Sequence, residues 1–284
     1  MFELILENKS GDKINFASNS AFTVTLIEGL NPPDATINLS DIALMDGAMF
    51  NSSKLNVRYI NIAFAIEYEA AKNRIEVYKV LKSKQYVKMY YKGDYRDVYI
   101  EGYIESINID YFEMKQIVTC AIVCPSPFFK EAQMMVNELK NVVKVFHFPF
   151  ASTETPELVM SYINNETGIS IENDGDVECG MIIEMYAGDN ISDPKIFNYV
   201  TGEYIGLKFD MEQGDLITID TRPGQKTVTL LRSGVESNIF NYIIQGSTWL
   251  QLSPNGDTFV YEVGTGLDAD LNITFKHENL YEGV

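Results

Sequence analysis

The side chains with the widest chemical range in this sequence are three cysteines and two histidines, so metal binding and redox chemistry are considered first. Cys120 and Cys124 lie in the segment IVTCAIVC, whose β-branched residues favour a strand. On an extended strand their Cα atoms would be about 13 Å apart, whereas a disulfide needs about 7 Å or less. No second ligand pair follows at zinc spacing, and Cys179 is 55 residues further on. We therefore expect both cysteines to be small buried hydrophobic residues.

The histidines and carboxylates form no catalytic pattern either. His147 and His277 have no cysteine, histidine or acidic partner at ligand spacing, and no G-x-S-x-G motif precedes His277. His147 lies between Phe146 and Phe148, which fits a strand histidine better than a general base. Among the 40 acidic residues, no pair has the apolar setting that glycoside hydrolysis requires. We expect no enzymatic activity, no metal ion and no cofactor.

Two polar loops contain the residue types of a calcium site. Residues 173–176, NDGD, lack the alternating acids, the sixth-position glycine and the twelfth-position glutamate of the calcium loop. These residues and residues 253–257, SPNGD, are typical of tight hairpin turns instead.

Trp249, the only tryptophan, suggests a different kind of site. An exposed aromatic plate can stack on the apolar face of a sugar ring. Trp249 and Tyr261 are therefore candidate carbohydrate-binding residues. The alternation in WLQL also fits core packing, so both interpretations stay open.

The elements that must position these residues are mostly strands in the first 124 residues. Residues 55–68 predict a central strand, with Arg58 and Ile60 on one face and Tyr59 on the other. Residues 40–53 have no clear period and are expected to form a long loop. The other predicted strands are 2–6, 13–16, 22–28, 86–91, 98–109 and 116–124.

Residues 69–83 are the one good helix candidate. Ala71, Ile75, Tyr78 and either Leu81 or Lys82 form an apolar stripe at three- and four-residue spacing. We expect this stripe to face the core of the first domain.

The segment CPSPFFK, residues 124–130, divides the chain. Pro125 and Pro127 have no backbone N–H to donate, so a strand should end at Cys124. Phe128 and Phe129 are too apolar for a free linker and should pack back on the completed domain. The predicted domains are residues 1–130 and residues 131–284.

The second half predicts a sandwich or barrel. After a possible strand at 142–150, short strands recur every 8–12 residues with Gly, Asn and Asp turns between them. The predicted strands are 158–163, 169–172, 180–187, 196–199, 204–209, 215–220, 227–231, 248–252, 257–263 and 271–276.

Composition limits the partners that the protein can have. The formal net charge is −18, and no Lys/Arg cluster could supply the basic face that a nucleic-acid binder needs. No apolar run reaches the ~18 residues that span a bilayer, and the N-terminus does not have the pattern of a signal peptide. The odd number of cysteines fits a reducing cytoplasm. We expect a soluble protein that does not insert into membranes.

In their order along the chain, these segments resemble the distal tail protein family of long-tailed, siphovirus-type bacteriophages. The resemblance rests on CPSPFFK at 124–130, IENDGD from Ile171, WLQLSPNGDTFVY at 249–261 and the ending FKHENLYEGV. It spans nearly the whole chain. It implies a mainly β protein with an N-terminal β-barrel-like domain that carries one amphipathic helix, followed by a C-terminal galectin-like β-sandwich.

The resemblance also implies a structural role in the virion, at the distal tip of the tail, after assembly in the host cytoplasm. Members form a homo-hexameric ring that joins the tail tube protein to the tail-tip hub protein. The ring also offers attachment for a receptor-binding protein or side fibre. The genome would pass through its channel without specific binding, which the negative charge favours.

Three other functions remain as alternatives. A carbohydrate-binding module would use Trp249 and nearby tyrosines for attachment to the host surface. A cell-wall-degrading enzyme would need a catalytic pair that the sequence does not single out. A tail-tube subunit would need only about one domain of this size, so the predicted sandwich after residue 130 argues for the distal ring.

Overall fold

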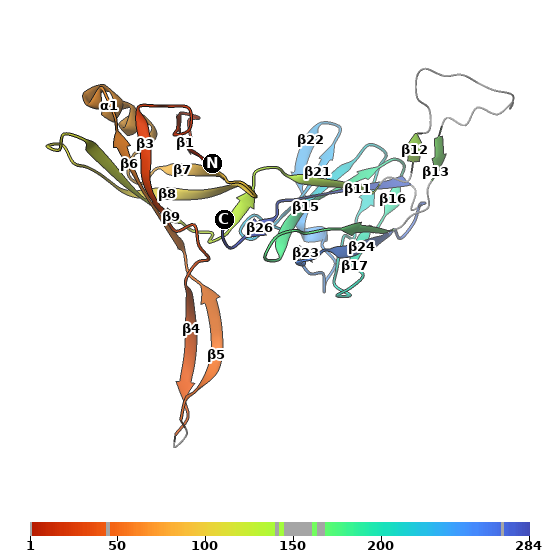
Figure 1. Ribbon diagram of the computed structural model, residues 1–284. Coiled ribbons are helices and arrows are strands. Elements are labelled where there is room, and N and C mark those ends of the chain that lie inside the picture. The colour runs from red at the N-terminus through yellow and green to blue at the C-terminus, as the bar shows by residue number, and fades with distance from the viewer. Residues whose placement is uncertain (1, 44–45, 140–141, 145–160, 164–167, 268–269) are drawn as a thin grey trace, which may run out of the picture. The chain divides into compact units, whose positions relative to one another are not determined.

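The computed structural model describes residues 2–43, 46–139, 142–144, 161–163, 168–267 and 270–284. The chain is mainly β, as expected, and divides into two compact units (Figure 1). The first unit comprises Met1–Ala132 and Leu280–Val284, and the second comprises Gln133–Asn279. The predicted second domain was therefore wrong at its end, because strand β26 (Leu280–Tyr281) pairs with β10 (Phe129–Glu131) of the first unit.

A nine-stranded sheet forms the first unit. Seven strands follow the order β2-β1-β7-β8-β9-β6-β3, and β10 pairs with both β8 and β26. The edge strands β2 and β3 are consecutive in the chain, and the rings of Phe16 and Phe22 between them lie 6.2 Å apart. The sheet thus curls back on itself, in agreement with a barrel-like first domain. Its strands are β1 Glu3–Asn8, β2 Lys13–Asn15, β3 Phe22–Glu28, β6 Arg58–Ile66, β7 Tyr86–Lys92, β8 Asp97–Ile109 and β9 Gln116–Cys124.

Helix α1 (Ala70–Val80) packs against β1, β2 and β6, but through a different face from the one predicted. Its buried side chains are Asn73, Val77 and Val80, whereas Ile75 is 57% exposed and Tyr78 is 37% exposed. The side chains that are buried have the same three- and four-residue spacing as the predicted apolar stripe, but the first of them, Asn73, is polar. Asn73 can be buried because its side-chain amide donates to the Tyr68 carbonyl at 2.6 Å.

The predicted loop at 40–53 is instead part of a long hairpin, which we call the arm. Strands β4 (Ala35–Asp41) and β5 (Ala48–Leu55) pair antiparallel and form a sheet of their own. Figure 1 shows the arm extending away from the nine-stranded sheet of the first unit. The register shifts between Asn38 and Leu39, and this irregularity hides the period-two pattern in the sequence.

Two sheets form the second unit. One has the order β11-β25-β15-β20-β21-β22, with β23 also paired to β15, and the other has the order β14-β24-β17-β18. Strand β12 pairs with β13, and β16 pairs with β19. The bounds are β11 Met135–Leu139, β12 Val142–Lys144, β13 Ser161–Ile163, β14 Gly168–Ile171, β15 Cys179–Ala187, β16 Ile191–Ser192, β17 Lys195–Asn198, β18 Tyr204–Gly206, β19 Asp210–Met211, β20 Leu216–Asp220, β21 Thr227–Arg232, β22 Val235–Asn238, β23 Gln251–Leu252, β24 Asp257–Glu262 and β25 Leu271–His277, with a 3-10 turn at Phe240–Tyr242.

The core of the second unit lies between its two sheets, as in a β-sandwich. Phe259 of β24 and Phe275 of β25 come from different sheets, and their stacked rings are 5.2 Å apart. Both side chains are buried, together with alternate residues of β15 and β20. This alternation confirms the expected sandwich.

The two turns that were predicted to close hairpins connect different sheets instead. Residues 172–178 lead from β14 to β15, and residues 253–256 lead from β23 to β24; neither pair of strands is hydrogen-bonded. Asn255 and Gly256 have φ of 71° and 90°, so the turn chemistry itself was correctly predicted. Residues 145–150 of the predicted strand 142–150, with His147, lie outside the described residues.

Asp215 should make the second unit sensitive to acid. Its carboxylate is buried and accepts bonds from Arg232 at 2.9 Å (Nε) and 2.5 Å (Nη2). Burial alone would raise the pKa of Asp215, but the bonds from Arg232 and the Glu212 amide outweigh it and lower the pKa. Because the folded-state pKa is below the unfolded one, this stabilisation is present above the unfolded pKa and is lost as the pH falls through the folded pKa. Asp215→Asn should cost about 1–3 kcal/mol at neutral pH.

The direction of this pH dependence can be checked by urea unfolding between about pH 7 and 3. The fluorescence of Trp249, which lies in the second unit, reports the unfolding of that unit. The stability difference between wild type and Asp215→Asn should shrink as the pH falls. Glu262→Gln, which removes the exposed pair with Lys195, is the matched control and should change little. A difference that stays constant with pH would contradict the prediction.

Candidate binding surfaces

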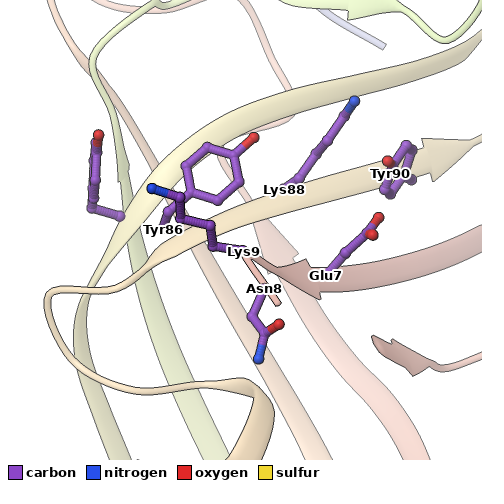
Figure 2. Close-up of a pocket in the computed structure, with 7 residues that line it drawn as sticks. Glu7, Asn8, Lys9, Tyr86, Lys88 and Tyr90 are labelled. Carbon is purple, nitrogen blue, oxygen red and sulfur yellow. The ribbon is translucent and has the colours of Figure 1, made fainter. Parts of the chain in front are cut away.

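A groove lies on the face of the first-unit sheet that points away from its core. It measures about 740 Å³ and is lined by residues of β1, β7 and β8 and of the turn after β1. Figure 2 shows Glu7, Lys88 and Tyr90 on the same side of these strands, with Asn8 pointing to the opposite side. We call it the tyrosine–lysine groove. Its lining residues are Glu7, Asn8, Lys9, Tyr86, Lys88, Tyr90 and Tyr103.

Cross-strand pairing explains why tyrosines gather in this groove. Tyr86 lies opposite Tyr103, and Tyr90 lies opposite Tyr99, in the register of β7 and β8. The ring centroids of the two pairs are 6.3 and 6.1 Å apart. The Lys88 ammonium lies over the rings of Tyr99 at 3.5 Å and Tyr90 at 4.9 Å. Tyrosine rings with lysines between them provide an amphipathic surface that suits protein contact.

A half-buried ion pair lies next to the groove and holds the Tyr86 hydroxyl. Glu101 accepts hydrogen bonds from Tyr86 at 2.6 Å and from Lys130 at 2.7 Å. Burial alone would raise the pKa of the Glu101 carboxyl, but these two donors outweigh burial and lower it. Burial and the neighbouring Glu7 raise the pKa of Tyr90 to about 12. Tyr90 therefore stays a neutral donor at physiological pH.

The arm is the second unusual surface of the first unit. All residues of β4, and all of β5 except Leu55, are exposed on both faces. Ile37, Leu39 and Phe50 lie on one face of the hairpin and are 60%, 58% and 61% exposed. The opposite face carries Asn38, Ser40 and Ser52, together with Met49, which lies opposite Ser40 and is 54% exposed. An isolated two-stranded hairpin is marginally stable at best, so its apolar face calls for a partner surface.

The junction motif lies where the sequence placed it, and it holds a buried cation that the motif alone did not reveal. β9 ends at Cys124, Pro125 is exposed, Pro127 and Phe128 are half-buried, and Phe129 is fully buried. The packing of Phe129 on the first-unit core confirms the expectation for these aromatics.

Arg58 connects the junction to two distant segments. Its guanidinium donates to the carbonyls of Gly29, Asn31, Pro127 and Glu282 at 2.5–2.6 Å. It also lies 4.5 Å from the centroid of the Phe129 ring. Burial lowers the pKa of Arg58, which is only 2% exposed. The four hydrogen-bond acceptors of its guanidinium are all neutral backbone carbonyls. The sequence had placed Arg58 on the same strand face as Ile60 but gave no signal for this role.

The predicted sugar-binding residues are not brought together as a surface. Trp249 is half-buried; its ring lies 5.8 Å from that of Phe240, and Lys226 lies 5.5 Å above it. Tyr261 is 5% exposed and belongs to the core, so it cannot offer a ring face to a ligand in this structure. A role for Trp249 in sugar binding stays a prediction, with exposed Phe240 as the partner that the sequence did not suggest.

The cysteines are buried, as expected, and unreactive. Burial raises the pKa values of Cys120, Cys124 and Cys179 to about 12. Within the described ranges, no group of three or more His, Cys, Asp or Glu residues could hold a metal ion. In the same part of the chain, no helix is long and apolar enough to cross a membrane.

Comparisons with known proteins agree with this geometry. Residues 174–278 match the family model of the siphovirus-type tail component, C-terminal domain. A search of curated proteins finds no match. The crystal structure of the Dit protein of phage SPP1, described as a paradigm of the hub adsorption apparatus in phages that infect Gram-positive bacteria, is similar over 99% of both chains, with a TM-score of 0.70 and 12% identity.

Two structures of the phage P2 baseplate in its activated conformation, with calcium and with strontium, are also similar. Their matched chains are covered completely, at 12% identity, with TM-scores of 0.55 and 0.54. At this identity the likeness shows a shared fold that extends over both units. Residues 174–278 thus match the siphovirus-type tail component, C-terminal domain, and the whole chain shares the fold of the Dit protein of phage SPP1.

Proposed function

We propose that the protein forms a closed ring of identical subunits, six by resemblance to the distal tail protein family, at the distal end of the tail tube. The ring joins the tube to the tail-tip hub protein and offers attachment for a receptor-binding protein or side fibre. It is assembled in the host cytoplasm before it becomes part of the virion. Its role is structural.

The observation that carries this proposal is the arm. Ile37, Leu39 and Phe50 expose an apolar face that nothing in the described chain covers. A contact between this arm and a different surface of the next copy is head-to-tail, and such contacts produce a ring when the rotation closes. The likeness to Dit and to baseplate chains supports the same location in the tail. The net charge of −18 supports a channel through which DNA passes without binding.

The ring can be tested with the purified full-length protein. Light scattering should give a mass about six times that of the 32.1 kDa chain, and negative-stain images should show a six-fold particle with a central hole. The same measurements are repeated after mixing with tail tube protein and hub protein. A single-chain mass both alone and in these mixtures would contradict the ring.

A further inference from the structure

We infer that the arm of one copy docks in the tyrosine–lysine groove of the neighbouring copy, and this inference rests on the proposed ring. Both surfaces belong to the first unit, at different parts of its sheet. The arm leaves between β3 and β6, whereas the groove lies on β1, β7 and β8, on the other side of β9 in the strand order. A contact between two different surfaces of identical chains repeats around a ring.

The composition of the arm shows what its partner must offer. Its apolar face carries Leu39 opposite Phe50 and, next along the hairpin, Asp41 opposite Ala48. The arm and its tip contain two aspartates, Asp41 and Asp46, against one lysine, Lys54, and Asp34 directly precedes the arm. A matching surface must therefore be concave, accept apolar and aromatic side chains, and carry positive charge.

The groove meets each of these requirements. It is a concavity on a sheet whose tyrosines offer ring faces, and Tyr103 at its edge is 51% exposed. Lys9 and Lys88 line it, and Lys13 and Lys130 lie next to it. Lys13 pairs with Glu7 and Lys130 pairs with Glu101, which leaves a local excess of two positive charges. A local excess of positive charge is unusual in a chain with 40 acidic and 22 basic residues. Such complementarity steers association and fixes register.

The arm is also long enough for the groove. The eight residues of β5 span about 26 Å, whereas the part of β7 that lines the groove, Tyr86–Tyr90, spans about 16 Å. The extended arm can therefore lie along the strands of the groove instead of meeting it at one point.

A second protruding segment of the first unit is a weaker candidate for the groove. Phe112 and Met114, in the turn between β8 and β9, are fully exposed. The same turn is held by its own chain, because the Tyr111 and Tyr78 hydroxyls are 2.5 Å apart and Arg74 lies 4.8 Å from the Tyr111 ring. In the described part of the arm, β4 and β5 pair only with each other, so the arm is the better candidate.

Two full-length variants test the pairing, each altered only at exposed side chains. The arm variant combines Leu39→Ser with Phe50→Ser, and the groove variant combines Lys9→Glu with Tyr103→Ser. Each variant alone should fall from the mass of the ring to that of the 32.1 kDa chain. An equal mixture should give a dimer and nothing larger, because the intact arm of the groove variant fits the intact groove of the arm variant. Phe112→Ser and Tyr199→Ser are matched controls that should leave the ring intact.

The other outcomes separate the two proposals. If the wild-type protein forms a ring and either variant still does so, the arm–groove contact is overturned while the ring stands. If both variants are single chains but their mixture does not pair, the two surfaces are not partners of each other. Loss of the ring in Phe112→Ser with a retained ring in the arm variant would assign the groove to the turn. If the wild-type protein forms no ring, the proposed function fails first.

Discussion

Replacement of Arg58 by methionine should lower the free energy of unfolding of the first unit by about 3 kcal/mol or more. The side chain is 2% exposed, and its four acceptors are carbonyls from three separate segments of the chain. Methionine fills a similar volume but donates no hydrogen bond, so those carbonyls would stay buried without their charged donor. Hydrogen bonds to charged groups are the strong class, and an unsatisfied buried carbonyl bears its full desolvation cost.

Arg58→Lys discriminates this account from a simple requirement for positive charge. An ammonium is a compact charge with three donors, whereas the guanidinium is a planar fork that here reaches in several directions. Lysine should therefore recover only a small part of the loss. It also loses the planar contact with the Phe129 ring, which lies 4.5 Å from the Arg58 guanidinium.

The measurement is urea unfolding of full-length variants, with circular dichroism for the whole chain and Trp249 fluorescence for the second unit. The first-unit transition should move to lower urea, while the fluorescence transition should stay within error. Lys79→Met, at an exposed position of α1, is the control and should cost below about 1 kcal/mol. Equal stability of Arg58→Met and wild type would contradict the role assigned to the guanidinium.

The sequence predicted those parts of the fold that local chemistry determines. Pro125 after a β-branched run ends β9 at Cys124, and the regular alternation of β3 and β9 reproduces their observed bounds. The helix was located, but its buried face was not. The reason is that two stripes with equal spacing compete, and only the Asn73 bond to the Tyr68 carbonyl decides between them.

The tyrosine–lysine groove and the arm could not be predicted from the sequence, because both depend on how strands pair with one another. The tyrosine–lysine groove depends on the register that puts Tyr86 opposite Tyr103, and register is a property of strand pairs, not of one segment. The arm was hidden by the register shift after Asn38 and by an apolar face that no described residue of the chain covers. Trp249 was weighed as a lone residue, although Phe240 supplies its neighbouring ring.

The second large effect is expected from the last five residues, because Leu280–Val284 complete the first unit. A chain that ends at Ala132 should be at least about 3 kcal/mol less stable in its first unit than the full-length protein. It lacks β26, the buried Tyr281 ring and the Glu282 carbonyl that accepts from Arg58. Arg96 also loses its contacts with the Gly283 carbonyl and the Tyr281 ring.

Residues 1–132 joined to residues 280–284 by a short Gly-Ser turn should recover most of this stability. The design is possible because Lys130 lies opposite Leu280 in an antiparallel pair, so a turn can close β10 and β26 into a hairpin. Circular dichroism during thermal unfolding of the two shortened chains measures the difference. If they unfold at the same temperature, the final segment contributes nothing to the stability of the first unit.

A higher melting temperature of the joined chain would instead mean that the second unit is an insertion between two neighbouring strands, β10 and β26, of the first unit. The first unit would then have to receive its last strand after Gln133–Asn279 has been synthesised.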